Sequence, residues 1–474
     1  MIIQGGMGAG VSNWKLAKTV SETGQLGVVS GTAIDTIVSR RLQLGDPGGH
    51  MQRAMAHFPD TGMAKRILDR FYKSTGSASH SPFKRTPMIS LVADPLTAEL
   101  TMVANFVEVF LAKEGHDNPV GLNLLEKIQL PNLYALYGAM LAGVDYVIMG
   151  AGIPREIPGV LDRLSDHLPV SLRIAVETVN GSRFHADFDP KASLPLDLPK
   201  LKRPKFLAIV SSVLLARMMV RKATGRVDGF VVELPVAGGH NAPPRGKLVL
   251  SDQGEPVYGD RDDIALEKIK ALGLPFWMAG SWGTPEKLKE ALSLGAAGVQ
   301  IGTALAFSEE SGFTAAIKQQ AIQNIQKGTA SIFTDPLASP TGFPFKVLSL
   351  KKSLSEARAY QARPRACDLG YLRQLYENAG GQIGYRCPAE PEAAYTAKGG
   401  RPEDTKGKKC LCNALLANIG LGQIRKSGYV ENILVTSGDS ILALRSFLKD
   451  DRPYKAKDVI DWLLGRPPIA TTPA

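Results

Sequence analysis

Eight short apolar segments recur in this sequence, each followed by a loop of small residues and then by a helical pattern. They occupy residues 1–4, 26–30, 120–124, 145–149, 206–211, 229–234, 275–279 and 298–301. Apolar runs of this length are typical of strands buried on both faces of a parallel sheet. Strands that alternate with helices form βαβ units with right-handed crossovers. Eight such units predict an α/β fold, a (β/α)₈ barrel with its functional site at the carboxyl ends of the strands. An open doubly wound sheet is the alternative.

Two longer stretches interrupt this alternation. Residues 45–115 and 169–205 are expected to be insertions, and the runs at 87–92 and 170–176 within them could be additional strands. A chain of 474 residues is too long for one ordinary core. We therefore expect a barrel over residues 1–334 and a smaller C-terminal extension over residues 335–474.

The composition restricts the class of protein. Apolar residues make up 44% of the chain and charged residues 21%, as is ordinary for a soluble globular protein. The formal net charge is +11, but Lys and Arg are dispersed along the chain and form no nucleic-acid-binding motif. Binding of an anionic ligand, or solubility, therefore explains the positive charge better than binding of nucleic acid. The N-terminus lacks the pattern of a secretion signal, and the longest apolar stretch, residues 206–220, is too short and interrupted to span a bilayer. We expect a cytoplasmic protein without a membrane partner.

The segment after the apolar run at 229–234 is the first candidate for a functional site. Pro235 ends the run, and Gly238, Gly239 and His240 follow. Two glycines allow the backbone to approach a flat ligand closely while the imidazole is directed at it. The alternative is a glycine-rich surface turn that carries a solvated histidine.

A second candidate lies at the ends of the last two predicted strands. Gly280 and Ser281 follow the run at 275–279, and Gly302 and Thr303 follow the run at 298–301. In a barrel, neighbouring loops of this kind present free backbone N–H groups and a helix N-terminus, which bind phosphate without Lys or Arg. Two glycine turns without a ligand remain the alternative, because short glycine motifs are weak signals.

Five motifs occur in an order that resembles nitronate monooxygenases, formerly called 2-nitropropane dioxygenases. They are IIQGGM at 2–7, GLNL at 121–124, AGGH at 237–240, AGS at 279–281 and LGAAGVQIGTA at 294–304. The resemblance covers roughly residues 1–310. It implies a TIM barrel with bound FMN that oxidises alkyl nitronates or nitroalkanes with molecular oxygen, so the partners would be a small nitro compound and O₂. Whether the chain forms a homo-oligomer stays open.

The resemblance also implies a role for individual residues. His240 would be catalytic, since a neutral imidazole can take the acidic proton beside a nitro group or hydrogen-bond a nitronate oxygen. The flavin supplies the redox step. The residues implied in cofactor binding are Gly5, Gly6, Met7 and Asn123 against the flavin, Gly238 and Gly239 beside it, and Gly280, Ser281, Gly302 and Thr303 at the phosphate.

The sequence departs from the family pattern at two places near these residues. Gly280-Ser281 stands where a Gly-Gly pair is usual, and Pro235-Val236 precedes AGGH where an acidic residue is common. These departures bear on the substrate more than on the cofactor. Arg245 is the only bulky cation near the motifs in sequence, so we expect FMN rather than FAD.

Two other functions remain open. A flavin-dependent enoyl reductase of a polyketide or fatty acid synthase type shares the barrel and the glycine-histidine loop, and it would need NADPH and an acyl carrier. A flavin-binding protein with incidental turnover could instead contact a partner through its C-terminal region. Inosine-monophosphate-type dehydrogenases share the phosphate loops but use a barrel cysteine, and this chain has no cysteine before Cys367.

All four cysteines lie near the C-terminus, at Cys367, Cys387, Cys410 and Cys412. Their number and clustering fit a reducing compartment better than a disulfide framework. A zinc site could be built from four thiolates, but only Cys410 and Cys412 are close in sequence, and their spacing is not the one usual in zinc sites. Ordinary buried thiols are the favoured interpretation.

Overall fold

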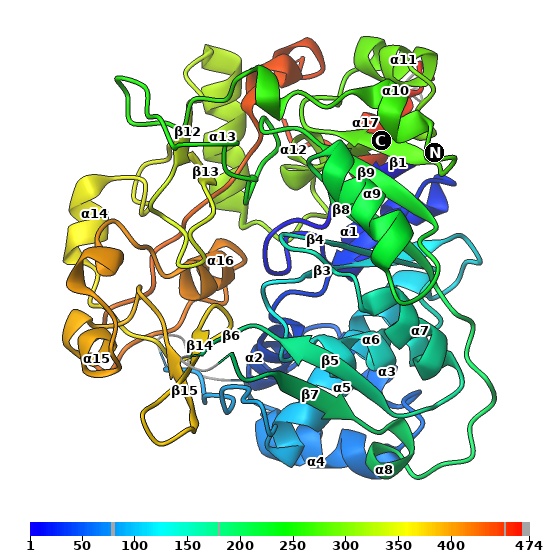
Figure 1. Ribbon diagram of the computed structural model, residues 1–474, viewed down its shortest axis with the longest axis vertical. Coiled ribbons are helices and arrows are strands. Elements are labelled where there is room, and N and C mark those ends of the chain that lie inside the picture. The colour runs from blue at the N-terminus through cyan, green and yellow to red at the C-terminus, as the bar shows by residue number, and fades with distance from the viewer. Residues whose placement is uncertain (77–80, 179–180, 450–451, 467–474) are drawn as a thin grey trace.

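Eight parallel strands form a closed barrel, which lies on the right in Figure 1 beside the C-terminal region on the left. The fold is described by a computed structural model, which covers residues 1–76, 81–178, 181–449 and 452–466. The barrel strands are β1 (Ile2–Gln4), β2 (Gly27–Ser30), β3 (Val120–Leu125), β4 (Tyr146–Gly150), β8 (Lys205–Val210), β9 (Gly229–Glu233), β10 (Phe276–Ala279) and β11 (Gly298–Ile301). Their order around the sheet is β1-β11-β10-β9-β8-β4-β3-β2.

The two ends of this sheet meet. Ile3 and Leu26 form a parallel bridge, in which Gln4 N donates to Leu26 O at 2.9 Å and Leu26 N donates to Ile2 O at 3.0 Å. The eight predicted strands and the (β/α)₈ barrel are therefore confirmed, and the open doubly wound sheet is excluded by the closure.

The barrel interior is filled by apolar side chains that alternate with outward-facing ones. The interior cluster consists of Ile3, Leu26, Val28, Ile148, Leu207, Val231, Trp277 and Ala279. Residues two positions apart on a strand face the same side. Glu233, which follows Val231 by two, therefore faces the interior at the carboxyl end of β9, where the functional site was expected.

Each barrel strand is followed along the chain by a helix. These are α1 (Trp14–Glu22), α2 (Ile34–Gln43), α6 (Asn132–Leu141), α7 (Ile157–Ser165), α9 (Val213–Lys222), α10 (Leu266–Lys270), α11 (Pro285–Ser293) and α12 (Thr303–Ala306). Short polar side chains begin several of them: Asn13 Oδ1 accepts from Leu16 N at 3.0 Å, and Thr284 Oγ1 accepts from Lys287 N at 3.3 Å. Such caps satisfy N–H groups that have no partner inside the helix.

The first insertion is helical. It contains α3 (His50–Met55), α4 (Thr61–Phe71) and α5 (Pro95–Lys113). Residues 87–92 are not a strand, so that expectation was wrong. Their backbone pairs with side chains of the C-terminal region instead: Leu91 N donates to Tyr385 Oη at 2.8 Å, and Arg373 Nη2 donates to Ile89 O at 2.5 Å.

The second insertion contains residues 170–176, the other run that could have been an additional strand. β5 (Val170–Ile174) pairs antiparallel with β7 (Phe184–Phe188) outside the barrel. β6 (Val176–Glu177) pairs with β14 (Gln374–Glu377), and the short helix α8 (Pro190–Ser193) follows β7. The run at 170–176 therefore forms strands that do not enter the barrel, and one of them ties the insertion to the C-terminal region.

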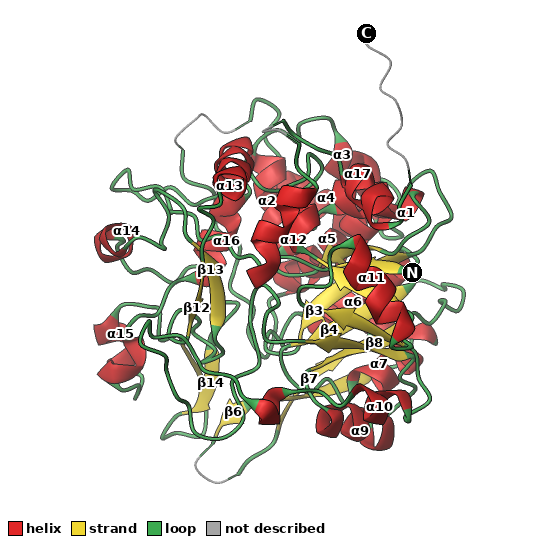
Figure 2. Ribbon diagram, turned by 90° about the horizontal axis from the view of Figure 1, so that it is seen from above, coloured by secondary structure: helices red, strands yellow, loops and turns green. Residues whose placement is uncertain are grey.

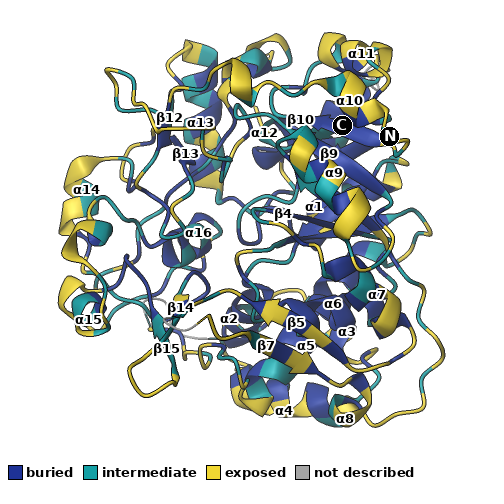
Figure 3. Cartoon of the chain, in the orientation of Figure 1, coloured by how far each residue is buried: buried dark blue, intermediate teal, exposed yellow. Residues whose placement is uncertain are grey.

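The C-terminal region lies beside the barrel mouth and returns to the barrel at its end (Figures 1 and 2). Its elements, with the short η1 (Asp260–Asp262) before them, are α13 (Ala315–Lys327), β12 (Ile332–Asp335), β13 (Phe345–Leu348), α14 (Ala357–Ala362), β14, β15 (Ile383–Arg386), α15 (Glu392–Ala397), η2 (Pro402–Thr405), α16 (Leu411–Asn418), η3 (Asp439–Ser446) and α17 (Ala456–Leu463). The barrel strands are buried, whereas α14 and α15 are mostly exposed (Figure 3). Because β12 crosses the expected boundary at 334/335 and pairs with β13, the division into two parts stays a prediction.

Within the described residues, one helix, α5, has the length and apolar composition of a membrane span. Of its apolar window, 72% is buried inside the molecule. It packs on α1, α2 and α6, and this packing accounts for its apolar character.

Candidate functional site

A cavity of about 220 Å³ lies at the carboxyl ends of the barrel strands. Its lining brings together every residue that the sequence motifs predicted for the site: Gly5, Gly6, Met7, Asn123, Gly238, Gly239, His240, Gly280, Ser281, Gly302 and Thr303. They come from the loops after β1, β9, β10 and β11 and from β3, which are far apart in sequence. The closure of the barrel places them at one mouth.

Within the described residues, the loop after β1 has two cavity-lining backbone N–H groups without an acceptor, those of Gly6 and Gly8. Gly5 N donates to Ile301 O at 2.7 Å and Met7 N donates to Ser12 Oγ at 3.0 Å, whereas Gly6 N has no partner within the described residues. A Cβ on Gly6 would lie 2.3 Å from the Cβ of Asn123. A glycine is therefore required for this loop to pack on β3.

The loops after β10 and β11 are neighbours because their strands pair, with Ala279 opposite Gln300. In the part of the chain that the structure describes, the amides of Gly280, Ser281, Gly302 and Thr303 have no hydrogen-bond acceptor. Adjacent unpaired N–H groups of this kind form an anion site. Among the described residues, no Lys or Arg lines the cavity. Arg245 hydrogen-bonds Ser211 O and Arg261 O instead.

Ser281 stands in an unusual backbone conformation. Its φ is +61°, and that of Gly280 is +90°. Both lie in the left-handed region, where glycine is favoured and other residues carry strain. Strained residues collect at functional sites when the surrounding structure holds them in place. This explains why a Gly-Gly pair is usual at these positions.

His240 is half-buried and faces the cavity. Its Nε2 and Ser339 Oγ are hydrogen-bonded at 2.8 Å, and Ser339 Oγ in turn is bonded to Thr341 Oγ1 at 2.8 Å. The ring packs against Phe345 with centroids 4.9 Å apart. Burial, with a smaller contribution from the Lys127 charge, lowers the pKa of His240 to about 4. The imidazole is therefore neutral near pH 7, and its contacts with Ser339 and Phe345 favour a site residue over a solvated turn histidine.

Glu233 also lines the cavity, although the sequence reasoning did not include it. Its carboxyl group has no hydrogen-bond partner within the described residues, and burial raises its pKa to about 7. The signal was present in the sequence: one acidic residue ends the run Gly-Phe-Val-Val-Glu of β9. A half-buried acid with a raised pKa at the carboxyl end of a barrel strand is a functional candidate.

Two further polar atoms in the cavity lining are buried without a partner. They are Gln300 Oε1, an acceptor, and Trp282 Nε1, a donor. Buried polar groups in native proteins are nearly always hydrogen-bonded, and unpaired ones need an explanation. Together with the free amides, they fit a flat heteroaromatic ligand that bears a phosphate group.

The C-terminal region completes the cavity wall on both sides of the Gly238-Gly239 segment. Gly239 N donates to Thr436 Oγ1 at 2.7 Å, and Lys346 N donates to Gly239 O at 2.9 Å. Gly438 N donates to Thr303 Oγ1 at 3.0 Å. Sequence reasoning missed these contacts because no local pattern marks them: Gly239 and Thr436 are 197 positions apart.

The four cysteines gather around one small cavity away from this site. Cys387 and Cys410 are buried, and Cys367 and Cys412 pack against them as free thiols. Among the described residues, no group of three or more His, Cys, Asp or Glu side chains is arranged to hold a metal ion. The zinc alternative therefore gains no support.

The comparisons with known proteins bear on the same region. The family model described as nitronate monooxygenase matches residues 177–335, which include the AGGH, AGS and LGAAGVQIGTA motifs, while the motifs at 2–7 and 121–124 precede the match. No curated protein matches the chain.

Three solved structures are similar in fold. FabK from Thermotoga maritima is 17% identical with a TM-score of 0.46, and it is matched over 98% of this chain and 91% of its own. A nitroalkane oxidase from Streptomyces ansochromogenes is 15% identical with a TM-score of 0.47, over 98% and 94% of the two chains. The enoyl reductase domain of MlnA from Bacillus amyloliquefaciens is 13% identical with a TM-score of 0.47, over 98% and 92%. At these values the likenesses say nothing about the reaction of this chain.

Proposed function

Residues 177–335 match the nitronate monooxygenase family, and from this premise we propose that the chain is an FMN-dependent oxidoreductase that oxidises alkyl nitronates or nitroalkanes with molecular oxygen. The observation that carries the proposal is the cavity at the barrel mouth, where free backbone amides and a neutral His240 meet. An anion site beside an enclosed imidazole is what a phosphate-bearing cofactor and a proton-transfer reaction need.

The cofactor would be held mainly by backbone groups. Gly6 and Asn123 would lie against the flavin ring, and Gly238 and Gly239 beside it. Gln300 and Trp282 would pair with its polar edge, since both have buried atoms without partners. The amides of Gly280, Ser281, Gly302 and Thr303 would bind the phosphate. The flavin, when bound, accepts the electrons of the substrate and passes them to oxygen.

His240 would act on the substrate proton. Its neutral ring has a lone pair to accept the proton from the carbon beside a nitro group. Ser339 Oγ, 2.8 Å from Nε2, fixes the orientation of the ring and can donate or accept there. A base with a pKa of about 4 stays unprotonated over the whole neutral range.

An enoyl reductase is the second candidate, and one observation favours it. A larger cavity of about 1080 Å³ adjoins the site, which is more room than a short nitroalkane needs. A reductase of this kind would draw its electrons from NADPH. A flavin-binding protein whose C-terminal region serves a partner is the third candidate, and cytoplasmic location stays a prediction for all three.

The decisive experiment mixes the purified flavoprotein anaerobically with ethyl nitronate or with NADPH and follows the visible flavin band by stopped-flow spectroscopy. Rapid bleaching by the nitronate alone supports the proposal. Bleaching by NADPH alone supports the reductase, and slow bleaching by both supports the binding protein. Acid release and chromatography of the chromophore tests the cofactor, because FMN is expected and FAD would contradict the assignment.

A further inference from the structure

The cavity of about 1080 Å³ lies between the barrel mouth and the C-terminal region. Its walls are the loops after β3 and β4, the strands β5 and β6, and three segments of the C-terminal region, residues 337–342, 370–375 and 403–408. We call it the outer chamber. The cavity at the barrel mouth, called the inner cavity below, adjoins the outer chamber. Leu125 lines the inner cavity and its neighbour Glu126 lines the outer chamber. Likewise, Gly150 lines the inner cavity and its neighbour Met149 lines the outer chamber.

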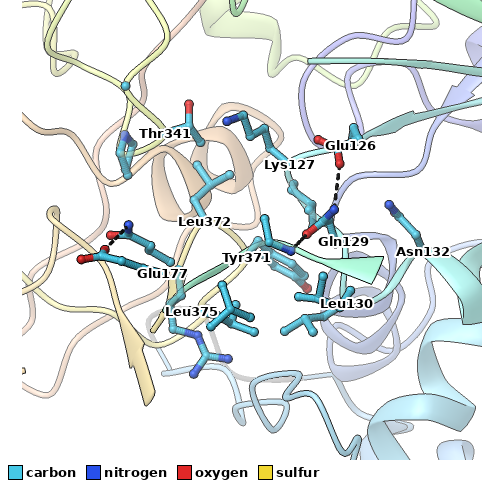
Figure 4. Close-up of a pocket in the computed structure, with 18 of the residues that line it drawn as sticks. Glu126, Lys127, Gln129, Leu130, Asn132, Glu177, Thr341, Tyr371, Leu372 and Leu375 are labelled. Atoms are coloured by element: carbon cyan, nitrogen blue, oxygen red, sulfur yellow. Dashed lines mark hydrogen bonds between the residues drawn. The ribbon is translucent and has the colours of Figure 1, made fainter. Parts of the chain in front are cut away.

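A chain of hydrogen bonds connects a residue that lines the inner cavity with one that lines the outer chamber. His240 Nε2 bonds Ser339 Oγ at 2.8 Å, and Ser339 Oγ bonds Thr341 Oγ1 at 2.8 Å. Thr341 lines the outer chamber. Lys127 lies at the same end of the chamber as Thr341 (Figure 4), with its Nζ 4.7 Å from the centroid of the Phe343 ring. The candidate catalytic ring is therefore linked through two hydrogen bonds to the lining of this end of the chamber.

The charges that line the outer chamber are unbalanced. Its acidic side chains are mostly satisfied: Glu156, Glu177 and Asp404 are ion-paired with arginines, and Glu126 accepts from Gln129 at 2.7 Å. Only Glu403 has no such partner within the described residues. In contrast, five lining cations have no carboxylate within ion-pair distance among the described residues: Lys127, Arg173, Arg373, Lys406 and Lys408. The chamber therefore favours an anion.

Lys408 strengthens the positive end. Its Nζ donates to the backbone oxygen of Ser339 at 3.0 Å, so it lies beside the residue that bonds His240. Burial lowers its pKa more than the charges of Asp335 and Asp404 raise it. The Lys127 charge also reaches His240, where it helps to lower the pKa of the imidazole.

The other end of the chamber is apolar. Leu130 and Leu375 lie away from Lys127 and Thr341, and Leu372 lies between the two ends (Figure 4). Leu372 and Leu375 are mostly buried already, at 9% and 7% exposure. An apolar chain placed along them would remove further apolar surface from water, which is favourable in proportion to its area.

We propose that the outer chamber binds the reactant, an elongated amphipathic anion, with its charged head at Lys127 beside His240 and its apolar chain along Leu372 toward Leu130 and Leu375. The inference rests on the proposed function, since a nitronate is the anionic form of a nitroalkane. It deepens that function by selecting long-chain compounds over short ones.

The test uses dodecanoate, an unreactive long-chain anion, titrated into the purified flavoprotein by calorimetry. Each buried methylene strengthens binding by up to about fourfold. Dodecanoate should therefore bind at least about 100-fold more tightly than butanoate. It should also inhibit oxidation of a nitronate competitively. Equal binding of the two acids, or inhibition that is not competitive, would overturn the proposal.

Variants locate the charged head. Lys127→Gln should weaken dodecanoate binding by about tenfold, as expected for the loss of one charge-assisted hydrogen bond, and Lys127→Arg should restore it to within about twofold. Lys327→Gln is the matched control, since it removes the same charge from an exposed position on α13 far from the chamber lining. If Lys127→Gln binds dodecanoate no more weakly than the control, the proposal fails.

The calorimetric result is independent of the reaction. If dodecanoate binding depends on chain length and on Lys127 but no nitronate is oxidised, the proposed function fails while the anion site stands. If nitronates are oxidised but dodecanoate does not bind, the proposed function stands and the role of the chamber is refuted.

Discussion

At the scale of single residues, the proposed chemistry of the cavity depends on His240. Replacement by asparagine should leave the proposed FMN bound, because the contacts proposed for the cofactor come mainly from backbone groups of other residues. We expect kcat/KM for neutral nitroethane to fall by about 10²–10⁴-fold, the usual value of general-base assistance. Ethyl nitronate has already lost its proton, so its loss should be smaller. Steady-state oxygen consumption with both substrates measures the difference.

Each possible outcome for His240→Asn has a separate meaning. Equal losses with both substrates would show that the ring binds the nitro oxygens instead of removing the proton. Parent rates with both would contradict any catalytic role. The visible spectrum of the bound flavin is the control, since it reports whether the variant retains its cofactor.

A second prediction concerns the pH dependence of activity and follows from the pKa of His240. Because burial lowers this pKa to about 4, the base is lost only when pH falls through that region. The pH profile of kcat/KM for nitroethane should therefore decline with an apparent pKa well below 6.5, the ordinary value for histidine. A decline centred near 6.5 would mean that the base is exposed to solvent or is another group.

The raised pKa of Glu233 leads us to expect that stability depends on pH. Its pKa is raised from 4.5 to about 7 in the folded protein. Between these values the folded state holds the proton more tightly than the unfolded state does, so stability falls as pH rises. Relative to Glu233→Gln, the cofactor-free parent should lose up to about 3 kcal/mol between pH 4 and pH 8, at 1.36 kcal/mol per pKa unit. Urea unfolding at both pH values measures this difference. A constant difference would place the carboxyl group in water.

At the scale of elements, the loop after β10 combines a strained backbone with the proposed phosphate contacts. Ser281 has a φ of +61°, so Ser281→Gly should stabilise the cofactor-free protein by up to about 1 kcal/mol. FMN binding should persist, since the amide and not the hydroxyl is proposed to contact the phosphate. Ser293→Gly is the matched control: it lies at the end of α11, where glycine should destabilise by about 0.5–1 kcal/mol. Urea unfolding of both variants should therefore give opposite signs.

At the scale of the whole molecule, the C-terminal region and the barrel share one site. Gly239 N donates to Thr436 Oγ1, and Gly438 N donates to Thr303 Oγ1. Thr436→Val should leave the Gly239 amide unpaired, at a cost of about 1–3 kcal/mol, and should weaken FMN binding measured by flavin fluorescence. Thr329→Val, at an exposed position outside the cavity lining, should change nothing. Equal FMN affinities in the two variants would show that the C-terminal region does not support the site.

The barrel could be predicted from sequence because its signals are local. Each strand is marked in the sequence by a short apolar run, and each glycine motif lies directly after its strand. Closure of the eight units therefore brings the motifs to one mouth. The strand predicted at 87–92 was wrong because the prediction used only a local pattern. Such a pattern does not show that the backbone will pair with Tyr385 and Arg373 instead of with another strand.

The sequence by itself determined the strand order of the barrel units and the position of the glycine loops, and it made His240 a candidate, because these depend on residues that are neighbours along the chain. Only the tertiary structure decided the environment of those residues. The low pKa of His240 and the raised pKa of Glu233 arise from burial, and the outer chamber arises where the insertions meet the C-terminal region. Burial and enclosure depend on contacts between segments up to hundreds of residues apart, and no periodicity in the sequence records which segments will meet.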